Sequence, residues 1–366
     1  DPELDLSTTD YGDDDLWEEA EIALREGNTV QVGNNVYRYT GDDDDVALGT
    51  ENFNGASWQL VQPDTRNLSI TDYSDTRLWE LVDGTITTRA VAASLAASIG
   101  GKVGVAVSGA GAISTNEILT TSNAFIQDSN VVQAAKVDLD AANTSIITAT
   151  IAAASVAIGV GGKAGVGVSI GLSIAENRIG WNGGERSPAE VRAFVKDSAI
   201  ATAGSLTADA VSRSKIDAIV LAASAAIAGG GKAGVGVAGA GVSATNRVAT
   251  LIKAYVDGDG ATGISAADVA LRANDTSSIN AIGGAAAISA AFGGTAGVAV
   301  SVGVAVGQNH ISNEVEAYVA NADSTLSTNS GGVIIEAKTT AGIKALTAAA
   351  SVAIGGGGTA GIAVSG

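Results

Sequence analysis

The chain has 366 residues, of which 46% are hydrophobic and only 4% aromatic, with 48 Gly, 3 Pro and neither Cys nor Met. This composition excludes collagen and a disordered chain, and the lack of Cys excludes disulfides and thiolate metal sites. A net charge of −19 argues against binding to nucleic acid, which needs clustered Lys and Arg, and against binding to anionic lipid.

The negative charge is concentrated at the start of the chain. Residues 1–85 hold 21 Asp and Glu against 4 Arg, whereas the rest of the chain holds 18 acidic and 16 basic groups. We therefore expect a small acidic β-rich module, residues 1–88, followed by a repeat array, residues 89–366. No secretory signal is visible at Asp1, so we expect any targeting segment to lie outside this sequence or to have been removed.

Within the module, a pattern of Leu, an aromatic residue and Trp occurs in residues 6–17, 48–58 and 68–79. The Ser-x-x-Asp start of the first and third copies is typical of a helix cap. Trp17, Trp58 and Trp79 could form a platform for stacking sugar rings or anchor a small core, and we favour the core because Trp recurs with Leu at a fixed spacing. Between the copies, alternating residues on either side of Gly33 and Asn34 predict a short β-hairpin.

Runs of Asp are the candidate metal sites, because Ca²⁺ binds carboxylate oxygens in acidic loops. The candidates in the module are Asp42, Asp43, Asp44 and Asp45, and those in the array are Asp257 and Asp259. The run in the module has neither the spacing of an EF-hand nor that of the Gly-rich calcium nonapeptide. The competing interpretation is a solvated acidic face for the run in the module and an ordinary turn for Asp257 and Asp259. Ca²⁺ is the one cofactor that the sequence suggests.

The array is organised around an apolar block of about thirty residues, such as residues 219–248, that recurs five times. Each copy has two runs of Ala, Val and Ile around a Gly-rich centre, and the centres lie near residues 101, 162, 231, 294 and 357. The period between equivalent Lys or Thr residues of successive centres is roughly 61–69 residues. In the first four copies an Asn follows that Lys or Thr at one constant offset, at Asn116, Asn177, Asn246 and Asn309.

We interpret each block as a long Ala/Gly-rich β-hairpin. In a run such as residues 233–242, both the odd and the even positions hold small apolar residues, so both faces of the strand are apolar. The strand should therefore be covered on both faces or paired at its edges by neighbouring copies. The Gly-Gly-Lys centre is expected to supply positive-φ residues for a tight turn with Lys exposed at the tip. A membrane helical hairpin is the alternative, but each arm has only about 12–15 residues where about 20 are needed to span a bilayer.

After each Asn, the sequence predicts an aromatic strand and then short alternating strands broken by polar turns, as in residues 200–210. This pattern is typical of a parallel β-solenoid coil with aliphatic residues inside. The fold class is therefore all-β, an array of solenoid coils that each carry one hairpin. The recurring Asn could bind a ligand or form a buried amide ladder, and we favour the ladder because no other polar groups converge nearby.

The pattern in residues 68–79 and the Ala/Gly/Val coils such as residues 198–210 resemble giant bacterial cell-surface repeat proteins of the adhesin and hemagglutinin kind. The pentads at residues 155–159 and 351–355 also resemble head repeats of trimeric autotransporter adhesins, although the period here is longer. The resemblance implies an exported, largely β protein that acts in adhesion or in sheath or matrix formation. It carries over no catalytic residue.

An enzyme is not expected. The single histidine, His310, occupies a position where other copies have Glu117, Arg178 or Arg247, which is typical of a surface position. The Gly-x-Gly-x-x-Gly match at residues 234–239 lacks the strand-helix context of a nucleotide loop. Paired carboxylates for polysaccharide cleavage remain a third possibility, because β-solenoids host such enzymes.

We therefore expect a non-enzymatic extracellular protein that forms fibres, a sheath or a surface layer by head-to-tail stacking of its own copies. The fifth block ends at Gly366, before the position where its Asn would fall, so an excerpt from a longer chain or completion by a second copy is expected. The alternative is a surface adhesin that binds glycan or Ca²⁺ through the acidic module. No nucleic-acid partner and no membrane-spanning segment are expected.

Overall fold

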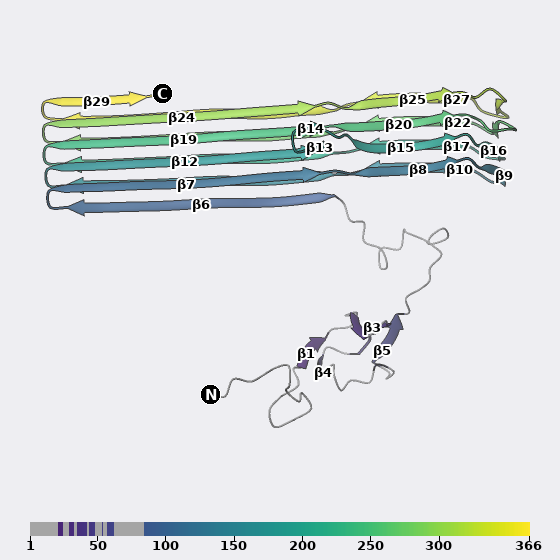
Figure 1. The fold of residues 1–366 in the computed structure, drawn as a ribbon, viewed down its shortest axis with the longest axis horizontal. Helices are drawn as coiled ribbons and strands as arrows, with labels where there is room; N and C mark the ends of the chain where they lie inside the picture. The colour runs from purple at the N-terminus through teal and green to yellow at the C-terminus, as the bar shows by residue number, and fades with distance from the viewer. Residues whose placement is uncertain are drawn as a thin grey trace. The chain divides into compact units, whose positions relative to one another are not determined.

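A computed structural model describes residues 84–366 throughout and, before them, residues 21–24, 29–32, 35–41, 44–47, 53 and 57–61. These residues form strands and connections, without a helix, so the described chain is all-β (Figure 1). They belong to two units, residues 1–81 and 82–366, which are described separately. Among the described residues, no helix has the length and apolar character needed to cross a membrane.

The first unit contains two small antiparallel sheets. One pairs β1 (Glu21–Leu24) with β4 (Asp44–Ala47), and the other joins β2 (Thr29–Val32), β3 (Asn35–Tyr39) and β5 (Trp58–Val61). The predicted hairpin is present, because Thr29–Val32 pairs with Asn35–Arg38 on either side of residues 33–34. Asp44 and Asp45 lie within β4, whereas Asp42 and Asp43 are outside the described residues.

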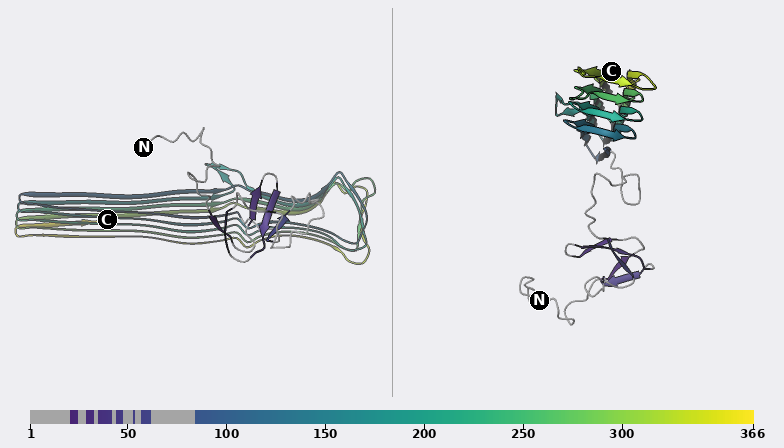
Figure 2. Two further views of the ribbon diagram at one scale, coloured as in Figure 1. Left: turned by 90° about the horizontal axis from the view of Figure 1, so that it is seen from below. Right: turned by 90° about the vertical axis from the view of Figure 1, so that its right-hand side faces the viewer.

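The second unit is a stack of five coils, which Figure 1 shows from the side and the left view of Figure 2 shows along the stacking axis. Each coil has two strands that form a narrow arm, and the first four coils add three shorter strands, which form a wider body. The strands of the first arm sheet are β6 (Thr85–Gly100), β11 (Ile146–Gly161), β18 (Lys215–Gly230), β23 (Ser278–Gly293) and β28 (Gly342–Gly357). Those of the second arm sheet are β7 (Val103–Ile118), β12 (Ala164–Ile179), β19 (Ala233–Val248), β24 (Ala296–Ile311) and β29 (Ala360–Ser365).

Three further parallel sheets enclose the body. The first contains β8 (Thr121–Gln127), β15 (Ala189–Lys196), β20 (Thr250–Asp257) and β25 (Glu314–Ala320). The second contains β9 (Asn130–Ala134), β16 (Ala199–Thr202), β21 (Ile264–Ala266) and β26 (Leu326–Thr328). The third contains β10 (Val137–Asn143), β17 (Leu206–Ser212), β22 (Val269–Asp275) and β27 (Val333–Thr339). An inserted antiparallel pair, β13 (Trp181–Asn182) and β14 (Glu185–Arg186), contributes to the longest of the repeat steps, from Lys163 to Lys232.

Parallel pairing in register holds the stack together. In the first arm sheet, for example, every residue of β11 pairs one to one with β6 on one side and with β18 on the other. Equivalent residues of successive repeats therefore lie beside one another, about 4.8 Å apart. The parallel, solenoid-like stack that the repeat predicts is thus the observed architecture.

The expectation of β-hairpins in the array is wrong. The two long strands of one coil belong to different sheets, so they are hydrogen-bonded to the neighbouring coils and face each other through their side chains. Each turn is therefore an arch between two layers rather than the end of a hairpin. The turns lie where predicted, after Gly100, Gly161, Gly230, Gly293 and Gly357, and Lys102, Lys163 and Lys232 are exposed at the tip.

The side chains between the two arm sheets become smaller toward the tip. In the second coil the inward residues of the first sheet run from Ile147 and Ile151 at the base, through Ala153 and Ser155, to Gly161. Two packed sheets ordinarily lie about 10 Å apart, and only glycine allows the backbones to approach more closely. Near the tip, a Cβ on Gly159 would lie 1.9 Å from the carbonyl oxygen of Val166 in the opposite sheet.

This close approach also corrects the predicted role of the turn glycines. Among the described residues, the glycines with positive φ are Gly180, Gly183, Gly258, Gly260 and Gly263, and none of them lies at an arm turn. At the glycine before each arm turn the two layers leave no room for a Cβ, as at Gly161, where a Cβ would lie 1.9 Å from the carbonyl oxygen of Ala164. The next glycine, Gly162, is close to the previous coil instead, with a Cβ 2.3 Å from the carbonyl oxygen of Gly101. The body, in contrast, is packed with larger residues, including Val191, Leu206, Ile252 and Leu271.

Replacement of Gly234 by Ala in β19 should destabilise the array by about 1–3 kcal/mol, the usual cost of overpacking. The new Cβ would lie 2.4 Å from the backbone oxygen of Phe292, which cannot rotate away. Gly239→Ala in the same strand is the matched control, because a Cβ there meets nothing within 4 Å. The control should be neutral or slightly stabilising in chemical denaturation, and equal destabilisation by both would contradict the close approach of the sheets.

Candidate functional site

The recurring asparagines form a continuous amide ladder inside the arm. Asn116 donates from Nδ2 to Oδ1 of Asn177 at 2.7 Å, Asn177 donates to Asn246 at 2.7 Å, and Asn246 donates to Asn309 at 2.8 Å. Asn177 and Asn246 are fully buried. The amides of Asn177 and Asn246 both donate and accept along the stacking axis, so the ladder joins the coils and uses these groups within the protein.

The acidic loop of the third coil links coils to one another. Asp259 is buried, and its Oδ2 accepts the backbone N–H groups of Ser324 at 2.9 Å and Thr325 at 2.7 Å. Asp257 accepts a 2.6 Å hydrogen bond from the side chain of Asn321. Both predicted calcium residues therefore bind groups of the next coil, and the structure gives Asp259 a structural role.

In the loops of the other coils that correspond to this one, the backbone conformation accounts for the Asp and Asn residues. Asp128, Asp197 and Asn321 have φ values of 48°, 45° and 52°, and Gly258 has φ of 86°. Backbone hydrogen bonds from Asp128 to Lys196, from Asp197 to Asp257 and from Gly258 to Ala320 place these residues at one corner of successive coils. Asp, Asn and Gly are the residues that tolerate this left-handed conformation, so a corner explains them without a metal.

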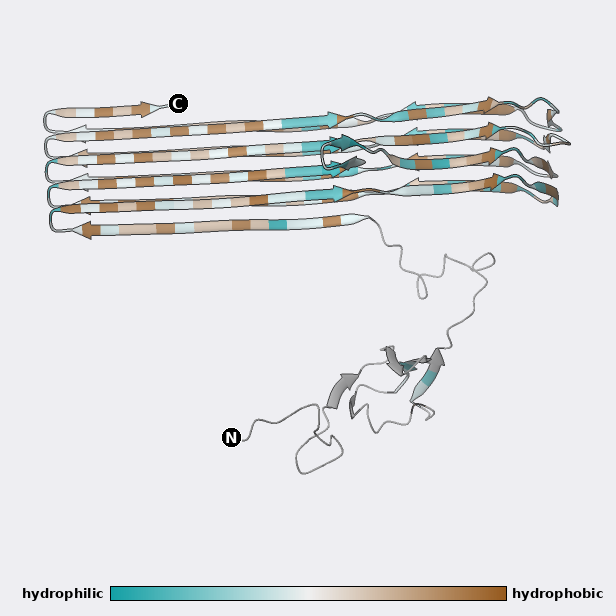
Figure 3. Ribbon diagram, in the orientation of Figure 1, coloured by the Kyte–Doolittle hydropathy of each residue, from teal (hydrophilic) through white to brown (hydrophobic). Residues whose placement is uncertain are grey.

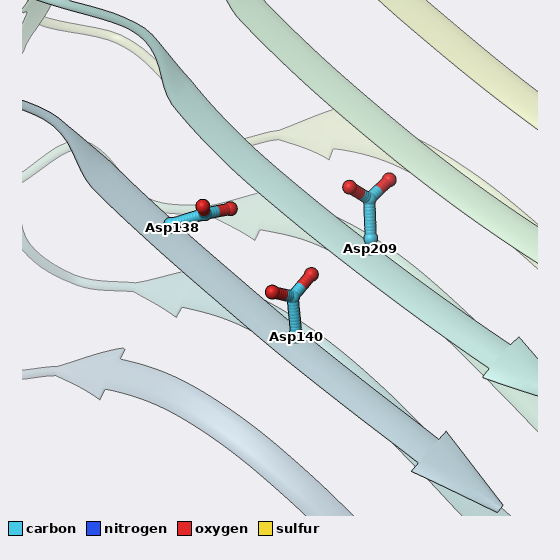
Figure 4. A group of neighbouring side chains, drawn as sticks. All are labelled: Asp138, Asp140 and Asp209. Carbon is cyan, nitrogen blue, oxygen red and sulfur yellow. The ribbon is translucent and has the colours of Figure 1, made fainter. Parts of the chain in front are cut away.

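A different group of carboxylates does come together. Asp138 and Asp140 point outward from β10, and Asp209 points outward from the neighbouring β17 (Figure 4). One carboxylate oxygen from each residue lies within 4.8 Å of the others. Among the described residues, no other group of three His, Cys, Asp or Glu side chains lies this close together. This group was not predicted from the sequence, although one repeat step carries Asp140 to Asp209 and their strands pair in register there.

The three carboxylates differ in their surroundings. The Thr207 hydroxyl donates a hydrogen bond to Asp138, and the Lys136 ammonium donates another at 3.0 Å, and these hydrogen bonds lower the pKa of Asp138. Partial burial raises the pKa of Asp140, and the charges of Asp138 and Asp209 raise it further. Asp209 lies 3.6 Å from Arg272 on the next strand. The group is therefore an exposed acidic patch with two basic partners, which could bind a cation only in competition with Lys136 and Arg272.

Aromatic side chains form a second ladder on the body. Phe125, Phe194, Tyr255 and Tyr318 stack with ring centroids 4.8–5.0 Å apart and interplanar angles of 9° or less. Burial raises the pKa of Tyr255 and that of Tyr318. The sequence predicted four aromatic strands at these positions but not the stacking of their rings, which follows from the register.

The tryptophans of the module are only partly described. Trp58 is buried and packs against Tyr39 and Phe53, with ring centroids 5.1 and 4.8 Å away, so its ring contributes to a small aromatic core. Trp17 and Trp79 lie outside the described residues. A sugar platform built on Trp58 is therefore disfavoured by its burial.

His310 lies on the outer face of the second arm sheet, in register with Arg247. Trp181, from the inserted β13, lies beside both: Arg247 is 5.0 Å from the centroid of its ring, and His310 approaches it edge-on at 6.3 Å. With Asn246, Gln308 and Asn309 these residues line an open pocket of about 360 Å³. His310 has no acid or nucleophile among these neighbours, so the pocket has no arrangement for nucleophilic catalysis.

Comparison with known proteins adds no further assignment. No family model, no curated protein and no solved structure matches the chain. The inferences below therefore depend on the residues and the geometry of this chain.

Asn177→Ala should cost at least ~2 kcal/mol of stability, because it leaves a buried donor on Asn116 and a buried acceptor on Asn246 without partners. Ser224→Ala is the control, because the buried Ser224 hydroxyl has no hydrogen-bond partner in the described structure and its removal should be neutral or stabilising. Chemical denaturation of both variants measures the difference. Equal effects would contradict the ladder's contribution.

Asp140→Asn should stabilise the array slightly at pH 7, by less than ~0.5 kcal/mol as is usual for surface changes. The folded-state pKa of Asp140 is raised, so its contribution to stability is most favourable below the unfolded value and is lost as the pH rises through the folded pKa. The gain from Asp140→Asn should therefore disappear near pH 3.

Asp138→Asn is the matched control for this change, with the opposite sign. The folded-state pKa of Asp138 is lowered, so its favourable contribution is present near neutral pH and is lost as the pH falls through the folded pKa. Melting curves at pH 7 and pH 3 test both variants, and stabilisation by Asp138→Asn at pH 7 would contradict the assigned roles.

Proposed function

We propose that this chain is part of a non-enzymatic, extracellular structural protein whose coils stack end to end into fibres, a sheath or a surface layer. The observation that carries the proposal is the identical parallel register between every pair of successive coils in both arm sheets. A coil added at either end would meet the same rows of backbone groups that already pair inside the stack.

The two ends of the described stack present such rows. β6 and β7 are the outermost strands of the arm sheets at one end, and β28 and β29 are outermost at the other. Unpaired edge strands are templates for further pairing. The coil that extends each edge can come from further repeats of the same chain or from a second copy, and both sources produce the same continuous β stack.

A structural role also fits the use of polar groups inside the array. The Asn ladder and the buried carboxylate of Asp259 form hydrogen bonds between coils. Asp275 is likewise buried and accepts hydrogen bonds from Asn313 at 2.7 Å and Thr339 at 3.0 Å in the next coil. These polar side chains therefore stabilise the stack by hydrogen bonds between successive coils.

The second candidate is a calcium-dependent surface adhesin, and the group of Asp138, Asp140 and Asp209 is the observation that favours it. In this alternative, Ca²⁺ would displace the Lys136 ammonium from Asp138 and bridge two coils. A polysaccharide-cleaving enzyme is the third candidate. It would need a general acid and a second carboxylate on opposite sides of a bound sugar, whereas these three lie together on one exposed sheet face.

Electron microscopy of the purified chain, with Ca²⁺, with Mg²⁺ and with chelator, tests the structural role. Filaments of uniform width with a regular spacing of about 4.8 Å along the axis are expected in all three conditions. Filaments that require Ca²⁺ would favour the adhesin-type alternative. Isolated particles of one chain in every condition, at high protein concentration, would contradict end-to-end stacking.

A further inference from the structure

The outer face of the first arm sheet is apolar across all five coils. Its outward positions between residues 91 and 99 of β6, and the equivalent residues of β11, β18, β23 and β28, are all Ala, Val, Leu, Ile, Phe or Gly. In Figure 3 the half of β6 toward its arrowhead is brown to white, without the teal of hydrophilic residues. We call this surface the outer arm face.

Side chains of the outer arm face are exposed in the inner coils of the stack as well as in the end coils. In the third and fourth coils, which have neighbours on both sides, Leu221 is 44% exposed, Ile227 43% and Ile288 51%. Side chains that face the opposite arm sheet from the same strands, such as Val220 and Ala226, are fully buried. The sheet is therefore covered on one face only, although both faces have the composition of a protein interior.

The area of the outer arm face matches that of a stable protein interface. From residue 91 to residue 99 it covers about 9 residues at 3.3 Å per residue and five strands at 4.8 Å, or roughly 700 Å². Monomeric proteins rarely expose apolar patches this large. A specific interface buries about 800 Å² on each partner, so a second surface of the same size would cover the face.

The face is corrugated in a way that is complementary to itself. A groove of about 500 Å³ crosses the five coils along two outward rows of residues. One of these rows consists of alanine alone, Ala93, Ala154, Ala223, Ala286 and Ala350. The next two rows toward the tip are bulkier and form a ridge, Leu95, Val156, Ala225, Ile288 and Val352, then Ala97, Ile158, Ile227, Ala290 and Ile354.

We propose that the outer arm face binds the same face of a second copy, about a two-fold axis that runs along the stack between the alanine row and the ridge. This axis places the two groove rows of one copy against the two ridge rows of the other. Ala154 then lies opposite Val156 of the second copy, and Ala286 lies opposite Ile288 of the second copy. The contact is isologous, as expected of a closed dimer.

The charges at the two ends of the face agree with this arrangement. The row at the base of the arm contains Thr148, Asp217, Asn280 and Lys344, and the turn at the tip carries Lys102, Lys163 and Lys232. The two-fold axis brings the base row of one copy close to the turn of the other, so Lys232 of the second copy approaches Asp217. Charged groups therefore stay at the rim while the apolar centre is covered.

A second copy explains the regularity of the face better than a lipid surface does. The groove and ridge recur at every coil with the spacing of the β ladder, and the axis keeps both stacks running in the same direction. Pairing can therefore continue coil by coil along stacks of any length. A fluid hydrocarbon surface needs no such match. The interface also repeats the contact already present inside the arm, where two Ala- and Gly-rich sheets pack face to face.

The test compares the full chain with two variants of one strand, Ala154→Glu in the groove and Thr148→Glu in the base row of the same face. Both side chains point outward from β11. Circular dichroism and melting curves establish that each variant folds. Sedimentation then measures dimers, and cryo-electron microscopy of any filaments counts the stacks across one filament.

The full chain and Thr148→Glu should be paired, as dimers in sedimentation or as two stacks per filament with overlapping arms. Ala154→Glu should weaken pairing by at least tenfold in Kd, because it puts a charge into the dry centre of the face. Filaments one stack wide for the full chain, or pairing unchanged by Ala154→Glu, would overturn the proposal. If end-to-end stacking fails, the dimer is still expected, so the two proposals fail separately.

Phosphatidylcholine vesicles provide the alternative partner in the same experiment. In the contrary outcome, the full chain fails to pair and instead floats with these vesicles, and Ala154→Glu abolishes that flotation. This result would assign the outer arm face to lipid and overturn the proposed pairing. A full chain that pairs and does not float supports it.

Discussion

Parallel pairing in register is the constraint on which the rest of this structure depends. It places each residue beside its equivalent in the next repeat, so every position must tolerate a neighbour of its own kind about 4.8 Å away. Asn satisfies this requirement because its amide both donates and accepts, and the aromatic rings satisfy it by stacking. Charged side chains satisfy it less well. Partial burial and the charges of Asp138 and Asp209 raise the pKa of Asp140, and Lys136 and Arg272 partly compensate the negative charge of the group.

The arm shows how the same constraint determines composition. Inward residues run from Ile147 at the base to Gly161 at the tip, so the two sheets converge until backbone meets backbone. Small side chains lose little conformational entropy on folding but also bury little apolar area each. The arm therefore depends on its length, on its continuous ladders of backbone hydrogen bonds and, if the outer arm face pairs, on a second copy.

The sequence was informative where the repeat itself carries the information. The constant spacing from each turn to its Asn located the turns and pointed to an amide ladder, because a residue repeated once per unit must stack once per coil. The all-β class and the parallel stack followed from the same period. These conclusions needed only that equivalent residues have equivalent surroundings.

Features that depend on how the two arm sheets pack against each other could not be predicted from the period of the repeat. A Gly-Gly-Lys turn is compatible with a hairpin or with an arch, and only the pairing of β11 with β18 rather than with β12 separates them. The strand at residues 233–242 was expected to be covered on both faces or paired at its edges by neighbouring copies, and β19 is paired at both edges, with β12 and β24. The role of Asp259 was missed because its partners, Ser324 and Thr325, lie one coil away.

The distance across the stack between two residues far apart in sequence tests the register most directly. Thr87 and Lys344 lie on the same exposed row, connected through Thr148, Asp217 and Asn280, and the chain has no native Cys to interfere with labelling. Spin labels on Thr87→Cys and Lys344→Cys should give a narrow distribution near ~19 Å, which is four steps of about 4.8 Å. A broad distribution, or one centred beyond about 30 Å, would contradict the in-register stack, since these positions would then be more than six such steps apart.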